Sequence, residues 1–297
     1  MVQDLRSDMS ERAAILQFAA EVSTVREQIE REIAPSHTVQ RILKMLKQLE
    51  LHLQQPPRIV IVGEANSGKT SLANILIGQD VLVTDLLRNT RATIVIKYSA
   101  SPTLCLIDRD GNRAPITEER LKAMQQGQFK SLELGLPSPR LREFEIMDNS
   151  GISMQPKHLM RMEQALRQAD VAIWCTLATQ AWKHSESSFW NSVSQRVKPF
   201  SVLLATHADA LSDDDTSKVM QRLQQEAGAQ FGEIAMISLR DAETTQPFAV
   251  GGGRVDDGIA GLRVKLDAML ATVDRRRLEV AKRVVHRMTL RVEELAR

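Results

Sequence analysis

Apolar residues recur at intervals of three and four positions near both ends of the chain. One such stripe spans positions 15–29 and a second spans 39–53, with Ala34-Pro35-Ser36 between them, and a third runs through positions 278–295. This spacing places apolar side chains on one narrow face of an amphipathic helix. Because the three stripes share a heptad-like form, we expect the two chain ends to build one helical bundle. Three separate surface helices are the alternative.

Between these ends, short runs rich in β-branched residues alternate with helical patterns. The runs that predict strands are 58–62, 92–98, 103–108, 143–148, 171–177, 200–206 and 233–237. The patterns that predict helices are 69–77, 117–125, 156–168, 185–195, 214–226 and 259–271. Asp110-Gly111 predicts a hairpin turn after the third strand. Alternation at this spacing is typical of βαβ units, so we expect an α/β fold with a mostly parallel central sheet flanked by helices.

The same patterns suggest where the domains begin and end. We expect N-terminal helices over residues 1–55, an α/β domain over 56–274 and a C-terminal helix over 275–297. That last segment carries eight basic and three acidic residues. A charged run of this kind is usually the solvated face of a helix, here beside the bundle seam. Peripheral contact with anionic lipid is the alternative.

Composition narrows the possible functions. The 297 residues include 39 Lys and Arg against 37 Asp and Glu, for a net charge of +2, and 4% are aromatic. Proteins that coat nucleic acid are strongly basic, and those that stack on bases are rich in aromatic residues, so we expect no nucleic-acid partner. Cys105 and Cys175 lie in apolar runs without CxxC spacing, which predicts buried free thiols. The sequence shows neither a signal-peptide pattern nor an apolar run of membrane-spanning length, so we expect a cytoplasmic protein.

The strongest chemical signal follows the first predicted strand. Positions 63–70 read Gly-Glu-Ala-Asn-Ser-Gly-Lys-Thr, the GxxxxGKT pattern of a phosphate-binding loop between a strand and a helix. Gly63 and Gly68 permit turns that aim backbone N–H groups at phosphate oxygens, and the following helix adds a positive dipole end. Lys69 would reach the β- and γ-phosphates, and the Thr70 hydroxyl would bind Mg²⁺. The expected nucleotide contacts in this segment are Gly63, Asn66, Ser67, Gly68, Lys69, Thr70 and Ser71.

A later strand ending in a DxxG pattern supports this interpretation. The run 143–148 ends at Asp148, and Gly151 follows three residues later. Asp148 would hold Mg²⁺ through a water molecule, and the backbone N–H of Gly151 would contact the γ-phosphate. The pattern is short by itself. After an apolar strand and downstream of a phosphate-binding loop, it indicates a nucleoside triphosphate site.

The end of the next strand points to guanine. Positions 206–209 read Thr-His-Ala-Asp, similar to the guanine-recognising [NT]KxD pattern with His207 in the place of lysine. The carboxylate of Asp209 would accept hydrogen bonds from the N1–H and amino groups of guanine. Adenine has an acceptor at N1 and would leave that charge unpaired, which is costly. A helix cap is the alternative role for Asp209. Thr206 and His207 would lie at the base, and Ser238 follows a strand where a further base-binding loop is expected.

These motifs resemble those of the dynamin-like GTPases, and of the bacterial ones especially. After the phosphate-binding loop, positions 72–84 read Leu-Ala-Asn-Ile-Leu-Ile-Gly-Gln-Asp-Val-Leu-Val-Thr, similar to the family's usual sequence pattern at this place. Positions 89–93, Asn-Thr-Arg-Ala-Thr, resemble its switch I. The resemblance covers roughly residues 56–274. It implies that Thr90 closes over Mg²⁺ and the γ-phosphate, with Thr93 as the competing candidate.

The resemblance also implies an activity and an assembly. A member of this family would bind GTP and GDP with Mg²⁺, hydrolyse GTP with Lys69, Thr90 and Gly151 as catalytic groups, and form a nucleotide-dependent homodimer. Terminal helices around the GTPase domain fit the family's habit of building a neck from both flanks.

Some positions depart from the family pattern. Ala65 stands where eukaryotic members carry a catalytic glutamine, and Ile152 where signalling small GTPases carry one that orients water. These departures leave open a GTP-binding assembly switch with negligible hydrolysis. A ribosome-associated GTPase of the Era type, which shares the phosphate-binding loop and the DxxG pattern, is a second alternative. The resemblance further implies a long stalk after position 274, where 23 residues follow. We therefore expect a minimal member, a fragment or a chain that works with a stalk-bearing or neighbouring partner protein.

Overall fold

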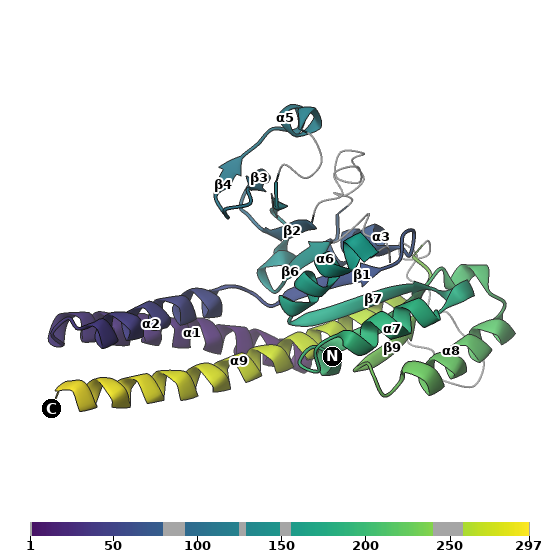
Figure 1. The fold of residues 1–297 in the computed structure, drawn as a ribbon. Helices are drawn as coiled ribbons and strands as arrows, with labels where there is room; N and C mark the ends of the chain where they lie inside the picture. The colour runs from purple at the N-terminus through teal and green to yellow at the C-terminus, as the bar shows by residue number, and fades with distance from the viewer. Residues whose placement is uncertain (1, 80–92, 125–128, 149–155, 240–257, 297) are drawn as a thin grey trace. The chain divides into compact units, whose positions relative to one another are not determined.

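The computed structural model describes residues 2–79, 93–124, 129–148, 156–239 and 258–296. The chain divides into two compact units, one made of Met1–Pro57 and Asp267–Arg297 and the other of Arg58–Leu266. The long helix α9 (Gly258–Ala296) contributes residues to both units (Figure 1). Among the helices described, none combines the length and the hydrophobicity that a membrane crossing needs.

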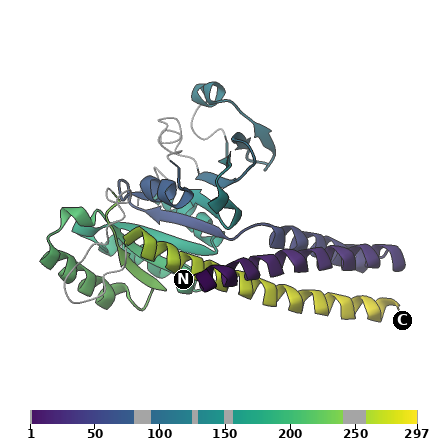
Figure 2. The same ribbon diagram turned by 180° about the vertical axis from the view of Figure 1, so that it is seen from behind.

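The first unit is a helical bundle made by both chain ends. Its helices are α1 (Val2–Glu32), α2 (His37–Gln54) and the second part of α9, and they lie side by side in Figures 1 and 2. The buried side chains of its core are Ile15, Ala19, Val22, Ile29, Val39, Ile42, Leu46, Leu53, Ala281, Met288 and Val292. These residues belong to the apolar stripes seen in the sequence, so the predicted bundle is confirmed.

Polar contacts fix the ends of the bundle helices. The hydroxyl of Ser36 accepts a hydrogen bond from the backbone N–H of Val39 at 3.2 Å and so caps the start of α2. The guanidinium of Arg12 on α1 donates to the backbone oxygens of Leu53 (3.2 Å) and Gln54 (2.7 Å). These carbonyl groups belong to the last turn of α2 and have no partner within that helix. Backbone groups at both ends of α2 therefore have side-chain hydrogen-bond partners: Ser36 at the start and Arg12 at the end.

The second unit is built on one sheet. Its strands are β1 (Arg58–Gly63), β2 (Thr93–Tyr98), β3 (Thr103–Ile107), β4 (Arg113–Pro115), β5 (Ser131–Leu136), β6 (Glu145–Asp148), β7 (Val171–Leu177), β8 (Ser201–Thr206) and β9 (Glu233–Met236). Among the described residues these nine strands have the order β4-β3-β5-β2-β6-β1-β7-β8-β9. The neighbouring pairs β6–β1, β1–β7, β7–β8 and β8–β9 are parallel, and so is the pair β2–β5. The pairs β2–β6, β3–β5 and β3–β4 are antiparallel. The predicted α/β fold with a mostly parallel sheet is confirmed.

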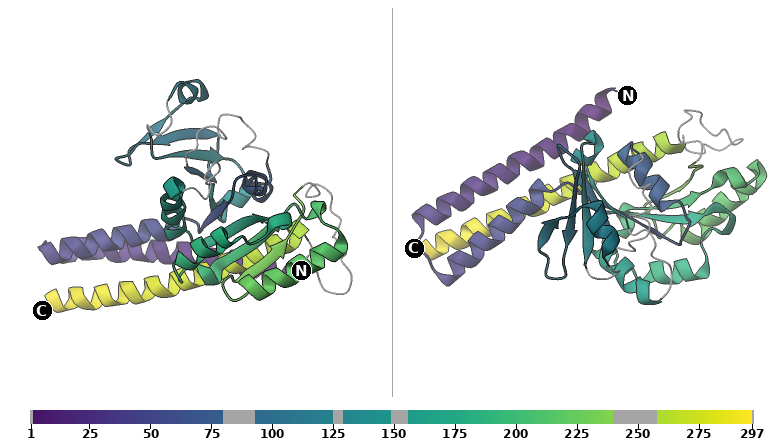
Figure 3. Two further views of the ribbon diagram at one scale, coloured as in Figure 1. Left: turned by 45° about the vertical axis from the view of Figure 1, so that its right-hand side comes forward. Right: turned by 90° about the horizontal axis from the view of Figure 1, so that it is seen from above.

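Helices cover both faces of the central strands. The described helices of this unit, besides the start of α9, are α3 (Lys69–Ile77), α5 (Glu118–Ala123), α6 (Pro156–Arg167), α7 (His184–Ser192) and α8 (Asp213–Ala227). Side chains of α6, α7 and α8 pack against the face that carries Val60 and Trp174. The right-hand view of Figure 3 shows α3 and the first turns of α9 on the opposite side of the sheet from α6 and α7. The arrangement is a three-layer α/β sandwich.

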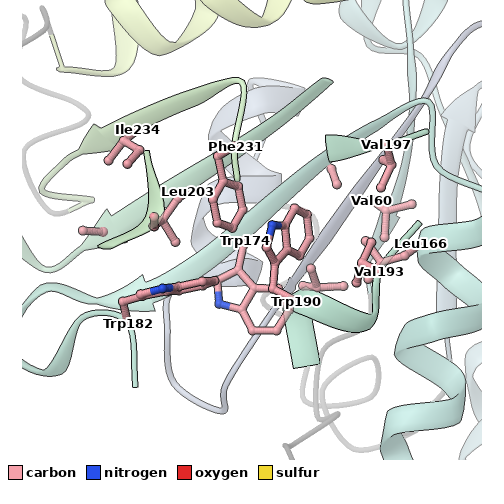
Figure 4. Close-up of a cluster of buried hydrophobic side chains, with 14 of the residues drawn as sticks. Val60, Leu166, Trp174, Trp182, Trp190, Val193, Val197, Leu203, Phe231 and Ile234 are labelled. Carbon is pink, nitrogen blue, oxygen red and sulfur yellow. The ribbon is translucent and has the colours of Figure 1, made fainter. Parts of the chain in front are cut away.

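An aromatic cluster fills the layer between β7 and α7 (Figure 4). The rings of Trp174 and Trp190 meet edge to face with 5.7 Å between their centroids, and Trp182 packs on Trp174 from another side at 6.2 Å. Phe231 stacks on Trp190 at 4.3 Å. Although only 4% of the chain is aromatic, all three tryptophans gather here. Cys175 and Cys105 are buried free thiols, as predicted.

Two features of the fold differ from the elements that the sequence patterns predict. The strand β5 was not expected, although its leucines alternate with other residues in the period of two that is typical of a half-buried strand; it lies between β2 and β3. The patterns at 259–271 and 278–295 also belong to one continuous helix, α9, rather than to two. No proline or glycine stands between them to end the helix.

The bundle core predicts the effect of two neighbouring substitutions on α2. Leu46 is fully buried, whereas Met45 is 48% exposed. We expect Leu46→Ala to lower the free energy of unfolding of the bundle by about 2–5 kcal/mol, because it leaves a cavity. Met45→Ala should change it by less than about 0.5 kcal/mol. Urea denaturation followed by circular dichroism measures both, and equal effects would contradict this assignment of the core.

Candidate nucleotide-binding site

The residues singled out by the motifs gather at one edge of the sheet. β1, β6, β7, β8 and β9 run parallel, so their carboxyl ends lie at the same edge. Gly63 ends β1, Asp148 ends β6, Thr206 ends β8, and Ser238 follows β9. β1 lies between β6 and β7, and the chain leaves it there to form α3. Crevices outside the carboxyl ends of such strands are the usual ligand sites of α/β sheets.

Backbone geometry at the predicted phosphate-binding loop requires glycine at position 63 and favours it at position 68. Gly63 has φ +139°, and a Cβ atom there would come within 2.0 Å of the backbone oxygen of Cys175 on β7. Gly68 has φ +75° and is the residue that precedes α3, while Asn66 also has a positive φ of 62°. Conformations of this kind turn successive N–H groups toward one side of the loop. The segment 63–68 therefore has the shape of a cradle for an anion, placed before the N-terminus of a helix.

Lys69 begins α3 and is 5% exposed. Its ammonium donates a hydrogen bond to the backbone oxygen of Glu64 in the same loop. Burial lowers the pKa of Lys69, while the nearby carboxylates of Asp148 and Glu64 act in the opposite direction. A buried ammonium that is balanced by neighbouring carboxylates and points back into the loop is suited to contact phosphate oxygens.

Thr206 joins the loop to the guanine motif. Its fully buried hydroxyl lies 3.1 Å from the backbone oxygen of Ser67, 3.1 Å from that of Thr176 on β7, and 3.0 Å from Nδ1 of His207. A hydroxyl has one proton, and carbonyl oxygens only accept, so the Thr206 proton serves the two carbonyl groups. The third contact places the imidazole ring of His207 against the Thr206 hydroxyl.

The remaining base-site candidates lie beside one another. His207 has a left-handed backbone (φ 58°), and Asp209 follows on the 3₁₀ turn Ala208–Ala210 with its side chain exposed. The backbone N–H of Ala208 donates to the oxygen of Ile237 at 3.2 Å, so this turn and the segment after β9 are joined. Ser238 comes next, and its buried hydroxyl oxygen has no hydrogen-bond partner among the described residues.

The metal and switch candidates are only partly covered by the described residues. Asp148 is 1% exposed and pairs in register with Ile61, two residues before the loop begins. Thr70 is partly buried in the first turn of α3, whereas Ser71 is exposed. Thr90 and Gly151, together with Ile152, lie outside the described residues. Thr93, the alternative to Thr90, begins β2 and is partly buried.

The motifs did not indicate a second set of polar residues that touches the loop. The side chain of Glu64 pairs with Lys183 at 2.6 Å, and the carboxylate of Glu186, three residues after Lys183, is buried. Glu186 accepts hydrogen bonds from Trp174 (2.9 Å) and from the hydroxyl of Thr176 (3.0 Å) on β7. A glutamate three residues into a helix is a capping-box signal, so the sequence offered a hint for Glu186. It offered none for Lys183.

Comparison with known proteins places this site in a family. The family model described as the Dynamin family matches residues 59–208. "Dynamin-like protein 2" of Campylobacter jejuni is 26% identical over 208 residues, which are 68% of this chain and 34% of that protein. "Isoniazid-induced protein IniC" of Mycobacterium tuberculosis is 30% identical over 115 residues, 36% of this chain and 23% of that protein. The chain thus spans about a third or less of the length of these relatives.

A solved structure shares the fold. It is described as "An oligomerised bacterial dynamin pair provides a mechanism for the long-range sensing and tethering of membranes", and it superposes with a TM-score of 0.60 at 15% sequence identity. The superposition covers 96% of this chain and 56% of that chain. The family match extends over more than half of the present sequence and contains the phosphate-binding loop, Asp148 and Thr206. The predicted resemblance is therefore confirmed, and the chain belongs to the dynamin family.

Proposed function

We propose that this protein binds GTP together with Mg²⁺ and hydrolyses the GTP to GDP and phosphate. The observation that carries the proposal is the loop 63–68, with glycines at its two ends in positive-φ conformations and with the ammonium of buried Lys69 hydrogen-bonded to the Glu64 backbone oxygen. Such a cradle at a helix N-terminus fits a phosphate chain. Two GTPases named among the relatives, GTPase Der and a probable transmembrane GTPase FZO-like, support the choice of nucleotide.

The residues at the sheet edge fit the parts of such a nucleotide. Lys69 would leave the Glu64 carbonyl oxygen and contact the β- and γ-phosphates. Thr70 and Asp148 supply the hydroxyl and the carboxylate, oxygen ligands that Mg²⁺ prefers. When bound, Mg²⁺ would neutralise charge on the phosphate oxygens. Thr90 and Gly151 are proposed to close over the γ-phosphate.

At the other end of the site, the base would lie between the turn after β8 and the segment after β9. Asp209 would accept hydrogen bonds from guanine. The hydroxyl of Ser238, which has no hydrogen-bond partner among the described residues, follows Ile237, whose backbone oxygen contacts this turn. Nδ1 of His207 lies 3.0 Å from the Thr206 hydroxyl, so this contact holds the ring beside the turn. Thr206 links base and phosphate ends through the oxygen of Ser67.

We further propose that hydrolysis depends on a second copy of the chain. Ala65 is exposed in the loop and has no group that could position water. A homodimer formed across the nucleotide face could organise the reaction. The solved dynamin pair is described as oligomerised, which supports this proposal. In this scheme residues 56–274 act as the GTPase domain and 1–55 with 275–297 as a neck, to which a stalk-bearing partner protein or a membrane surface could be coupled.

The first test removes the cation of the loop. We expect Lys69→Ala to weaken binding of a fluorescent GTP analogue by roughly ten- to 100-fold, because a charge-assisted hydrogen bond to phosphate is lost. Lys198→Ala is the matched control: Lys198 is also buried, but it precedes β8 at the opposite edge of the sheet. Equal affinity of a folded Lys69→Ala variant and the control would contradict the phosphate site.

The second test exchanges the base preference. Asp209→Asn should favour XTP over GTP, because xanthine carries a carbonyl group where guanine has an amine and the amide can donate to it. Asp213→Asn, a neighbouring exposed carboxylate in the first turn of α8, should leave the preference unchanged. Competition binding with GTP, XTP and ATP measures the outcome. A wild-type protein that prefers ATP would contradict the guanine assignment.

The third test concerns assembly. We expect GTP with Mg²⁺, or GDP with aluminium fluoride, to shift the protein from monomer to dimer, and we expect the specific activity to rise with protein concentration. Light scattering with GDP, GTP and the fluoride complex, together with phosphate release over a range of protein concentrations, gives both readouts. Lys69→Ala serves as the control that should not dimerise. A monomer in all three states with constant specific activity would instead favour a solitary switch.

A further inference from the structure

Lys183 occupies a position where lysine is locally unfavourable. It is the N-cap residue of α7, with an extended backbone (φ −64°, ψ 156°), and its side chain makes no capping hydrogen bond. Ser, Thr, Asp and Asn are preferred there because their oxygens accept from the first N–H groups, which an ammonium cannot do. A positive charge also opposes the positive end of the helix dipole. A capping role therefore does not explain this side chain.

The backbone of Lys183 is held firmly against β7. Its N–H donates to the carboxylate of Glu186 at 2.9 Å, and that buried carboxylate is itself bound by Trp174 and Thr176. Trp182, the preceding residue, has a left-handed φ of 60°, and its N–H donates to the Thr176 hydroxyl at 3.3 Å. Figure 4 shows its ring in the aromatic cluster beside Trp174. The starting point of the Lys183 side chain is thus fixed relative to the strand that adjoins β1.

From this fixed point the ammonium of Lys183 reaches the phosphate-binding loop. It lies 2.6 Å from the carboxylate of Glu64, and the two side chains are 37% and 24% exposed. The backbone oxygen of Glu64 accepts from Lys69 and, at 2.8 Å, from the hydroxyl of Ser67. Glu64 is therefore held through both its side chain and its backbone, and the backbone oxygen is the group that Lys69 must leave to contact phosphate.

We propose that Lys183 is a positioning residue of the nucleotide site, which fixes the backbone of the loop at residues 64–66 through its ion pair with Glu64. The inference rests on the proposed GTP binding at this loop. In this role Lys183 touches neither phosphate nor metal. It lowers the cost of ordering the loop around the phosphates, because the carbonyl group of residue 64 is already oriented before the nucleotide arrives.

The direct test uses Lys183→Thr and Lys183→Met in the full chain. Threonine restores a capping oxygen, so α7 should keep or gain thermal stability, while the link to Glu64 is lost. We expect both variants to bind fluorescent GDP roughly two- to fivefold more weakly, the scale of a partly exposed ion pair. Lys183→Arg should restore most of the affinity. If position 183 acted only as a helix cap, Lys183→Thr would instead bind GDP as tightly as the wild type or more tightly.

A second pair of variants separates positioning from the long-range effect of charge. Removing Lys183 takes a positive charge from the neighbourhood of the phosphates, whereas Glu64→Gln takes away a negative one. A purely through-space effect would therefore weaken binding in the first case and strengthen it in the second. We expect both to weaken it, and the double variant Glu64→Gln/Lys183→Met to be no worse than either single variant, since both remove one interaction.

The controls decide what a negative result means. Lys265→Met breaks a similar ion pair with Glu233 (2.9 Å) at the amino end of β9, away from the loop, and should leave GDP affinity unchanged. The difference between wild type and Lys183→Met should shrink at 1 M salt, which screens the pair. A wild type that binds no nucleotide would contradict the proposed function and this inference together. A wild type that binds, with an equally tight Lys183→Thr and a tighter Glu64→Gln, would overturn the inference alone.

Discussion

The close approach of β1 and β7 at Gly63 constrains where the loop 64–68 and the helix α3 begin. The backbone oxygen of Cys175 would lie 2.0 Å from any Cβ at position 63, so the chain can leave the sheet there only as glycine. The loop begins at that point, and α3 starts at Lys69. Because β1 and β7 pair from Ile59 with Val171 to Gly63 with Cys175, the loop that follows Gly63 starts at a fixed place beside the end of β7.

Two buried polar groups, Thr206 at the end of β8 and Glu186 on α7, are hydrogen-bonded to residues of β7. The Thr206 hydroxyl reaches the oxygens of both Ser67 and Thr176, and the Glu186 carboxylate is bound by Trp174, Thr176 and the backbone of Lys183. Burial raises the pKa of Glu186, and the hydrogen bonds that it accepts act in the opposite direction. Each group is buried yet has its partners, which is the condition under which polar networks stabilise one geometry. The segments that we propose to bind the base and the phosphates are thereby connected through the protein.

The helical bundle follows a simpler rule. Its core residues come from three apolar stripes, one on each helix. A single amphipathic helix cannot bury its own apolar face, so each stripe needs the other two helices to cover it. Packing α1, α2 and the second part of α9 against one another buries all three faces. Arg12 then satisfies the carbonyl groups at the end of α2, where a helix has no internal donors.

The sequence by itself determined the local elements and the order of the motifs. The helix predicted over 69–77 and the strand predicted over 171–177 are confirmed, because apolar spacing and a glycine-rich turn act over a few residues. Tertiary structure decided what those segments touch. Thr206 meets Ser67 across 139 positions and Lys183 meets Glu64 across 119, and no local pattern encodes such distances. The strand β5 has the alternating leucines of a half-buried strand, Leu132, Leu134 and Leu136, but its place between β2 and β3 is decided by pairing with residues distant in sequence.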